Sequence, residues 1–318
     1  MRSPSLLPIL TSLALGALLV YWVYSQETVG VGYTVVRAEE GTPLPIASAV
    51  FQFRNQDGVL VSEAGVEAVE PIGWGRIFVD QGDTRTGVAL ANASLDLLTL
   101  NLVLRDDSGL FVAQTNVPLG AQKQLPLFID ELFEDLPPGF RLGSLRIRTQ
   151  PVQGRVPAVT LRGSPNDHGE SIFATLPVVD LDQQASTEAP VGTPSFVFPH
   201  IGAGVVSALS TLSTQVILIN PSEIETLRGR IRLTGSQGTT LQLEMGGTTA
   251  SDFPYELGPN QVSKGTLRSS EAAVAGYAEV TVEEGPVLPS GTAIFQLGVL
   301  GNSSCDYMAY LRGLGPLT

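Results

Sequence analysis

Histidine, the side chain that most often performs acid–base catalysis near neutral pH, occurs only twice in this chain, as His168 and His200. A Ser-His-Asp or Cys-His arrangement would have to be built on one of them. The sequence lacks G-x-S-x-G, H-E-x-x-H, C-x-x-C and G-x-x-x-x-G-K-[ST], the usual marks of hydrolases, zinc proteases, thiol redox enzymes and phosphate-binding loops. Residues 202–207 approach G-x-G-x-x-G, but no helical pattern follows, which favours a turn. We therefore expect no catalytic or cofactor-binding residue and no enzyme activity.

Three acidic stretches lie in turns between expected strands and offer oxygen ligands for a hard cation. They are residues 80–83, 106–109 and 166–170, the last of which also contains His168. None has the Asp-x-Asp spacing and bidentate closing carboxylate of a calcium loop. Each stretch is predicted to be a polar turn, so no metal site is expected, and calcium binding at one of them is the alternative.

Four carboxylates fall in residues 128–136, the one stretch with the apolar spacing of a helix before Pro137 ends it. Asp130 and Glu134 would share a face of that helix, as an acid–base pair requires. Nothing apolar flanks this face to raise a carboxyl pKa. The pattern therefore favours a solvated helix side.

The charge balance argues against nucleic acid as a partner. The chain has 18 basic and 31 acidic residues, a net charge of −13, and only two lysines, Lys123 and Lys264. Neutralising phosphates requires clustered cations, so neither nucleic acid nor an anionic membrane surface is an expected partner. The single cysteine, Cys305, excludes an intrachain disulfide and a multi-cysteine zinc site. It is expected to be a small buried thiol in a strand.

The only targeting signal lies at the N-terminus. Arg2 precedes an apolar run over residues 6–24, which would extend about 28 Å as a helix, close to the ~30 Å hydrocarbon core of a membrane. Val23 and Ser25 suit a signal cleavage site, whereas the aromatic residues near them favour an uncut anchor. Residues 1–25 are thus expected to be either a signal peptide or a membrane anchor, and the rest of the chain to be exported.

Two sequence elements recur along the chain. The stretch GYTVVRAEEGTPLPIASAVFQF, from residue 32, returns without a gap from residue 276 as GYAEVTVEEGPVLPSGTAIFQL, with 11 of 22 positions identical. A shorter relative, GSLRIRTQPVQGRVPAVTLRG, starts at residue 143. The element TGVALANAS, residues 86–94, matches TQVILINPS, residues 214–222. Such repetition indicates one supersecondary unit used several times.

Period-two patterns predict that the repeated unit is built from strands. Residues 98–104 alternate leucine with other residues before a turn at 106–109, which predicts a hairpin. Residues 228–233 place three arginines on one strand face and Gly229, Ile231 and Leu233 on the other. The thrice-used element is expected to place on one face Phe51, Phe53, Val159, Leu161, Phe295 and Leu297. Its other face would then carry Gln52, Thr160 and Gln296.

These elements predict an all-β chain of tandem antiparallel β-sandwiches of immunoglobulin-like type after an N-terminal hydrophobic helix. An open barrel is the alternative. Residues 73–181 form unit one, 182–194 a linker, 195–318 unit two, and 26–72 only the back half of a unit. That half leaves its inward phenylalanines without a facing sheet. It is therefore expected to dock onto the unit that follows, or to pair by its edge with a neighbouring molecule.

The order of motifs resembles tandem β-sandwich repeats of large, uncharacterised exported bacterial proteins. The motifs are VFQFRNQDGVLVSEAGVEAV, RTGVALANAS, GSLRIRT with PAVTLRG, FATLPVVDL, FVFPH and STQVILINPS. The resemblance covers nearly everything from residue 32 to about residue 295. It implies fold and extracytoplasmic location and no catalytic signature.

From the sequence we expect a non-enzymatic exported or cell-envelope protein with a structural or adhesive role. Its partner would be a protein or glycan at the cell surface, or a further copy of the chain, with membrane contact only through residues 1–25. A module that binds polysaccharide or a calcium-dependent ligand is the first alternative. An accessory domain of a secreted hydrolase is the second.

Overall fold

The computed structural model describes residues 32–43, 45–166, 168–184, 194–299 and 305–312. Residues 33–318 form one compact part of the chain. The expected signal peptide or membrane anchor lies outside the described residues. Within the part that is described, no helix is both long and apolar enough to cross a membrane.

Residues 74–180 form two sheets, which together we call the first sandwich. One has the strand order β11-β3-β8-β5-β6 and the other β10-β9-β4-β7, and neighbouring strands are antiparallel. The strands are β3 (Trp74–Asp80), β4 (Arg85–Ala91), β5 (Leu98–Asp106), β6 (Phe111–Leu119), β7 (Gln124–Phe128), β8 (Leu142–Gln150), β9 (Ala158–Pro165), β10 (Ser171–Leu176) and β11 (Val179–Asp180). Two short helices accompany them, α1 (Ile129–Leu132) and α2 (Leu181–Gln184).

Residues 194–312 form the second sandwich. Its two sheets have the strand orders β17-β14-β19-β12 and β18-β13-β20-β21, and β12 joins them by also pairing with β13. The strands are β12 (Pro194–Ser207), β13 (Ser210–Ile219), β14 (Leu227–Gly235), β17 (Asp252–Leu257), β18 (Val262–Leu267), β19 (Val274–Glu284), β20 (Ser290–Val299) and β21 (Cys305–Arg312). A small separate sheet consists of β15 (Leu243–Met245) and β16 (Thr248–Ala250).

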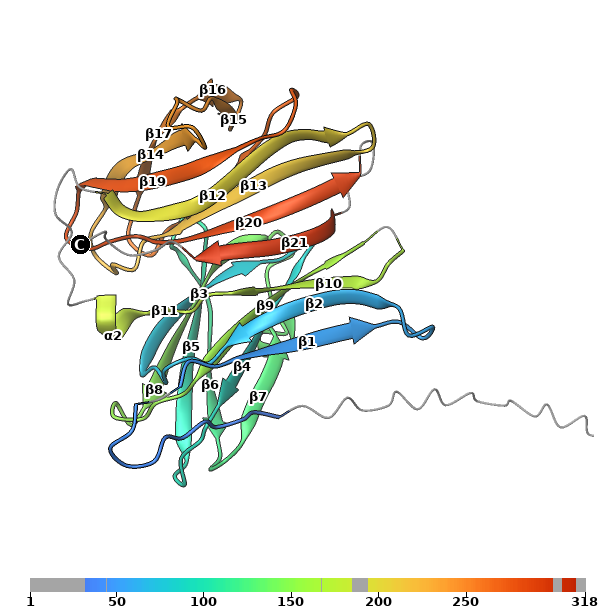
Figure 1. Cartoon of the computed structure of the whole chain (residues 1–318). Helices are drawn as coiled ribbons and strands as arrows, with labels where there is room; N and C mark the ends of the chain where they lie inside the picture. Colours follow the sequence, from blue (N-terminus) through green and yellow to red (C-terminus); the bar gives the residue numbers. More distant parts are fainter. Residues whose placement is uncertain (1–31, 44, 167, 185–193, 300–304, 313–318) are drawn as a thin grey trace, which may run out of the picture. The chain divides into compact units, whose positions relative to one another are not determined.

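The two sandwiches share one strand order (Figure 1). The sheet β6-β5-β8-β3 corresponds to β17-β14-β19-β12, and β7-β4-β9-β10 corresponds to β18-β13-β20-β21. The repeated sequences occupy equivalent strands: the stretches from residues 143 and 276 form β8 with β9 and β19 with β20, and the TGVALANAS type forms β4 and β13. Sequence repetition therefore corresponds to a repeated arrangement of antiparallel strands.

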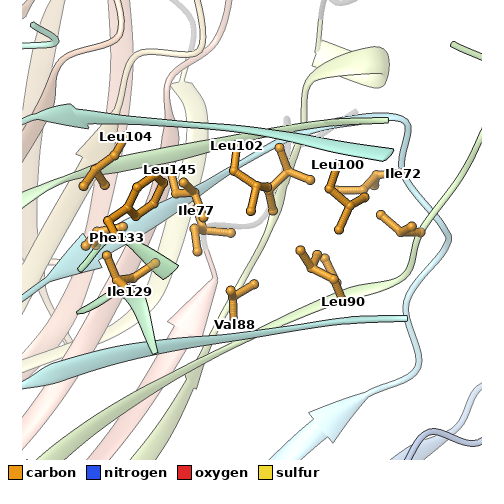
Figure 2. Packing of buried hydrophobic residues seen from close by; sticks show 14 of the residues in the cluster. Ile72, Ile77, Val88, Leu90, Leu100, Leu102, Leu104, Ile129, Phe133 and Leu145 are labelled. Atoms are coloured by element: carbon orange, nitrogen blue, oxygen red, sulfur yellow. The ribbon is translucent and has the colours of Figure 1, made fainter. Parts of the chain in front are cut away.

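The core of the first sandwich lies between its two sheets. Leu100 and Leu102 of β5 point toward Val88 and Leu90 of β4 (Figure 2), and each of these side chains is at most 2% exposed. Ile129 of α1 belongs to the same cluster. Burying each such side chain contributes about 1.5–3 kcal/mol, so alternating leucines hold the sheets face to face.

A hairpin precedes the first sandwich. It consists of β1 (Ser48–Arg54) and β2 (Leu60–Glu67), which pair with each other. The rings of Phe51 and Phe53 lie 6.2 and 6.3 Å from that of Phe173 on β10.

Two hydrogen bonds also connect β2 to β10. Ser62 Oγ accepts a bond from the Phe173 backbone N–H at 2.9 Å, and Thr175 Oγ1 donates to the Gly65 oxygen at 2.7 Å. The β1–β2 hairpin of the back half therefore docks onto the following unit, one of the two outcomes expected for it.

The helix expected over residues 128–136 is shorter than predicted. The helix α1 has four residues, and the Phe133 N–H closes it by bonding to the Ile129 oxygen at 3.1 Å. Both side chains are buried in the core, as the apolar spacing indicated. Pro137 disfavours helical geometry at the residue before it, but the helix already ends at Leu132.

On β9 the face predicted to be inward is the less buried one. Val159 and Leu161 are half-buried, whereas Ala158 and Thr160 are 2% and 0% exposed. The reason lies in Arg162, which shares a face with Thr160 and pairs with a buried carboxylate of β3. A strand that buries polar residues inverts the pattern expected from hydrophobicity.

Gly276, near the start of β19, occupies a position where only glycine fits. A Cβ there would overlap the Thr234 oxygen on β14, and one at the equivalent Gly143 would overlap the Arg105 oxygen on β5. We expect Gly276→Ala to lower the free energy of unfolding by about 1–3 kcal/mol through overpacking, as measured by urea denaturation. Gly65→Ala in β2 is the control, because no described atom lies within 4 Å of its added Cβ. Equal losses for the two variants would contradict the explanation.

Candidate functional site

The two histidines lie on different sandwiches. His168 is exposed in the turn before β10, where its backbone N–H donates to Asn166 Oδ1 at 2.9 Å. His200 of β12 packs its ring against Phe295, with centroids 5.1 Å apart. Among the residues that the structure describes, no three His, Cys, Asp or Glu side chains are placed to hold a metal ion. The two histidines therefore do not belong to one cluster.

In the turn at residues 166–170, the carboxylate of Glu170 is held by hydrogen bonds from neighbouring side chains. Glu170 accepts hydrogen bonds from Asn166 Nδ2 at 3.0 Å and from Asn55 Nδ2, in the hairpin, at 3.2 Å. These bonds, that from Asn166 first, lower the pKa of Glu170 below its ordinary value. Asp167 lies outside the described residues. The turn therefore helps to attach the hairpin.

The other acidic groups singled out in the sequence also bind neighbouring residues. Asp106 Oδ1 accepts the Leu110 N–H at 2.8 Å in the turn between β5 and β6. Asp130 accepts two bonds from Arg85, at 2.8 and 3.0 Å. Asp130 thus pairs with a cation, whereas the expected helix would have placed it beside Glu134.

The sandwiches meet in an apolar cluster that draws on both of them. From the first sandwich come Phe78, Ile172, Ala174, Leu176, Val179 and Leu181. From the second come Ile217, Ile219, Val262 and Ile294. We call this cluster, with the charged groups described next, the junction.

Arg76 of β3 has no exposed surface and lies at the junction. Its guanidinium donates to the Asn220 backbone oxygen at 2.8 Å and to Asn260 Oδ1 at 2.6 Å, both in the second sandwich. Glu223 Oε1 lies 3.8 Å from Arg76 and 2.9 Å from Arg146. Burial lowers the pKa of Arg76 to about 10, with Glu223 partly opposing the shift. Arg76 therefore remains a cation near neutral pH.

Asp80, at the end of β3, is the centre of a second charged group at the junction. Its Oδ2 accepts bonds from Arg162 Nη2 at 2.9 Å and Nε at 3.1 Å, and from Lys264 Nζ at 3.2 Å. Lys264 belongs to β18, so this group also connects the sandwiches. The side chains of Asp80 and Arg162 are 8% and 3% exposed. Charges buried to this degree require partners in correct geometry, so they make the junction specific as well as apolar.

The sequence patterns do not mark Arg76, Asp80 or Arg162 as junction residues. The available signal was the placement of charged residues inside otherwise apolar strands, as in WGRIFVD and AVTLRG. Lys, Glu, Arg and Asp are almost never fully buried unless paired. Such strands therefore indicate buried ion pairs, but not which residues are paired.

The threonine of the recurring TGVALANAS element connects its strand to the strand before it by side-chain hydrogen bonds. Thr86 Oγ1 accepts the Asp80 N–H and donates to the Asp80 oxygen, both at 2.9 Å. Thr214 makes the same pair of bonds to Gly202, at 3.0 and 2.7 Å. Both threonines are fully buried. The role is therefore structural in both sandwiches.

The asparagine of the same element holds loops together. Asn220 Nδ2 lies 2.7–3.0 Å from the carbonyl oxygens of Glu225, Leu257 and Gly258, and its Oδ1 accepts the Ser222 N–H at 2.9 Å. In the first sandwich Asn92 Nδ2 reaches three carbonyl oxygens in the same way, at 2.8–3.1 Å. Neither asparagine is exposed. Each asparagine side chain provides hydrogen bonds to loop backbone groups that have no backbone partner.

One row of side chains crosses β3, β8, β5 and β6 on the sheet face that also carries Arg76, and its Trp74 is half-buried against the junction cluster. Cross-strand register places Trp74 beside Arg148, Arg148 beside Asn101, and Asn101 beside Asn116. The Arg148 guanidinium lies 5.7 Å from the Trp74 ring centroid. Four strands at about 4.8 Å spacing span roughly 14 Å. A ring, a cation and two amides in one row suit the hydroxyls and carboxylates of an acidic polysaccharide.

A groove of about 820 Å³ lies along β2 and β10. Its lining is mixed, and the carboxylates along it are Glu63, Glu67, Glu70 and Asp180. Neither histidine belongs to it. The groove combines acidic and apolar residues without a gathered acid–base or nucleophilic set.

No family model matches the chain, and a search of curated proteins finds no match. Among solved structures, the chain is similar to the CupB6 tip adhesin from Pseudomonas aeruginosa. The two are 10% identical over 88% of this chain and 93% of the adhesin chain, with a TM-score of 0.13. A TM-score this low carries no argument, so function is inferred from the geometry above.

Proposed function

We propose that this chain is a non-enzymatic, exported or cell-envelope repeat protein whose immunoglobulin-like sandwiches serve a structural or adhesive role. The junction supports this most, because apolar residues and paired buried charges from both sandwiches meet there. Contacts of this kind favour one orientation of the sandwiches over others. A protein that presents a surface at a set distance needs such a fixed orientation.

The use of the buried polar groups also supports a structural role. Arg76 binds oxygen atoms across the junction, and Asp80 is bound by two cations. A catalytic group must instead leave one side open to a substrate. The buried threonines and asparagines of the repeated element serve backbone groups.

Export rests on the N-terminal sequence, where the apolar run over residues 6–24 follows Arg2. The partner we propose is a protein or glycan at the cell surface, or a further copy of the chain. A net charge of −13 disfavours nucleic acid.

Polysaccharide binding is the second candidate, and the row of Trp74, Arg148, Asn101 and Asn116 favours it. In an acidic protein this row brings together an exposed cation, a half-buried aromatic ring and two amide groups on one sheet face. The calcium-dependent form of this candidate has less support, because the acidic turn residues bind neighbouring residues.

The proposed function is tested by backbone nuclear spin relaxation on the full chain. We expect amides of both sandwiches to report one rotational correlation time. Ile219→Asp places a charge in the junction, where Ile219 is 5% exposed, and should give two different times. Ile224→Asp is the matched control, because Ile224 is 81% exposed, and should leave one common time.

Two different correlation times in the unsubstituted chain would overturn the structural role. A hydrolytic activity lost in His168→Ala or His200→Ala would contradict the non-enzymatic assignment. Binding of an acidic polysaccharide that Arg148→Ala abolishes would favour the second candidate.

A further inference from the structure

Matching residues of the repeated stretch lie in different environments in its two most similar copies. In β20, Ala293 and Ile294 are both 0% exposed. The matching residues of β1 are Ala49, which is exposed, and Val50, which is 59% exposed. A sequence typical of a central strand is therefore exposed in the first copy.

The difference arises at one edge of β1. The equivalent strands are paired on both sides, β9 with β10 and β4, and β20 with β21 and β13. Among the described strands, β1 pairs only with β2, which takes the place of β10 and β21. The edge that receives β4 or β13 in the complete copies therefore has no described strand beside it in β1.

This edge lacks the features that normally protect an exposed strand. The sequence SAVFQFR contains no proline, no lysine and no inward charge over its first six residues. The segment around it exposes large apolar side chains, namely Val35, Val36, Ile46, Val50, Phe53, Val59, Leu60 and Val69. An open, apolar edge favours addition of a strand.

The residues before β1 show the same incompleteness. Residues 33–43 contain no strand, although the matching residues form β19 between β12 and β14. At Gly285 a Cβ would overlap the Leu227 side chain of β14, whereas at the matching Gly41 no described atom lies within 4 Å. The neighbours that the repeat normally contacts are therefore absent from the described part of the chain.

We propose that β1 accepts an extended segment of the β4 and β13 type, supplied by a different protein and not by a second copy of this chain. The added strand would continue the β1–β2 ladder, as β4 continues β10-β9 and β13 continues β21-β20. The chain's own β4 and β13 already have partners on both edges, so neither is free to fill this place. The proposal goes beyond the proposed function, because the junction does not require it.

The second sandwich defines the register of the added strand. Thr214 lies opposite Phe295 and Val216 opposite Ala293, so a segment of this type would place the same residues opposite Phe51 and Ala49. Its valine and leucine side chains would cover the apolar face of β1. The recognition signal is a threonine, alternating apolar residues and a closing Asn-x-Ser.

The test uses a synthetic peptide, STLSTQVILINPS, which copies residues 210–222, as the probe for the full chain. We expect saturable binding by fluorescence anisotropy, and slower hydrogen exchange of the β1 amides when the peptide is bound. Ala49→Lys should weaken binding at least tenfold, because it places a charge opposite Val216 of the peptide while residue 49 is exposed in the free chain. Gln56→Lys, in the exposed turn after β1, is the matched control and should change affinity less than twofold.

A peptide carrying aspartate in place of Val216 and Leu218 should not bind. No binding of the native peptide at millimolar concentration would overturn the proposal, as would binding that Ala49→Lys leaves unchanged. Self-association of the chain that Ala49→Lys abolishes, without peptide binding, would identify a second copy as the occupant and also overturn it. The relaxation experiment on the junction is independent of all these results, so the proposed function can hold even if the peptide does not bind.

Discussion

Replacing Asp80 with asparagine should lower the free energy of unfolding by about 3–5 kcal/mol. The substitution preserves the shape of the side chain but removes the charge that Arg162 and Lys264 contact at 2.9 and 3.2 Å. Arg162 is 3% exposed and cannot turn toward water without moving the strands around it. A buried cation that loses its carboxylate costs more than a lost neutral hydrogen bond, so the fall in stability should exceed that of one such bond.

Urea denaturation followed by circular dichroism measures this loss. Asp83→Asn is the matched control, because Asp83 lies in the same turn and is exposed, and it should change stability by less than about 0.5 kcal/mol. Adding Arg162→Met to Asp80→Asn should restore part of the loss, because it removes a buried cation that no longer faces a carboxylate at position 80. A loss below about 1 kcal/mol for Asp80→Asn, or a double variant no more stable than the single one, would contradict the prediction.

Asn220→Ala should lower the free energy of unfolding by about 3 kcal/mol, the second largest effect expected. Its Nδ2 serves three backbone oxygens and its Oδ1 one backbone N–H. Each bond contributes about 1 kcal/mol, and buried groups left unpaired cost more. Because Asn220 also gives its backbone oxygen to Arg76, a shift of this loop would loosen the junction.

The same denaturation measurement tests this second substitution. Asn101→Ala is the control, since Asn101 is half-buried, donates one bond to Asn116 and accepts one long bond from Arg146. Its loss should stay below about 1 kcal/mol. Asn92→Ala, the equivalent change in the first sandwich, should match Asn220→Ala. Similar small losses for all three variants would show that the repeated asparagine does not hold the loops.

The strands with clean alternation could be predicted from the sequence. In β14 the residues Gly229, Ile231 and Leu233 are buried, and Arg228 on the other face pairs with Glu256 and with an acid on β19. The expected hairpin at β5 and β6 is also present. Period-two patterns succeed where one face is apolar and the other charged, because burial then fixes the register.

The junction could not be predicted, since its charged residues occupy apolar strands and their partners lie far away in sequence. Arg76 contacts Asn260, and Asp80 contacts Lys264. Thr160 was expected on the solvent-exposed face of its strand, but it is fully buried. Alternation shows which residues share a face but not which face a neighbouring sandwich covers.

The attachment of the hairpin has a mechanical consequence. Side-chain hydrogen bonds and ring contacts connect β2 and β1 to β10, and among the described strands no ladder joins them. Tension applied before β1 would therefore peel off the hairpin while both sandwiches stay closed. Residues 33–72, drawn out at about 3.3 Å per residue, would lengthen the chain by roughly 130 Å. A protein fixed at that end would yield to a sudden pull and could recoil afterwards.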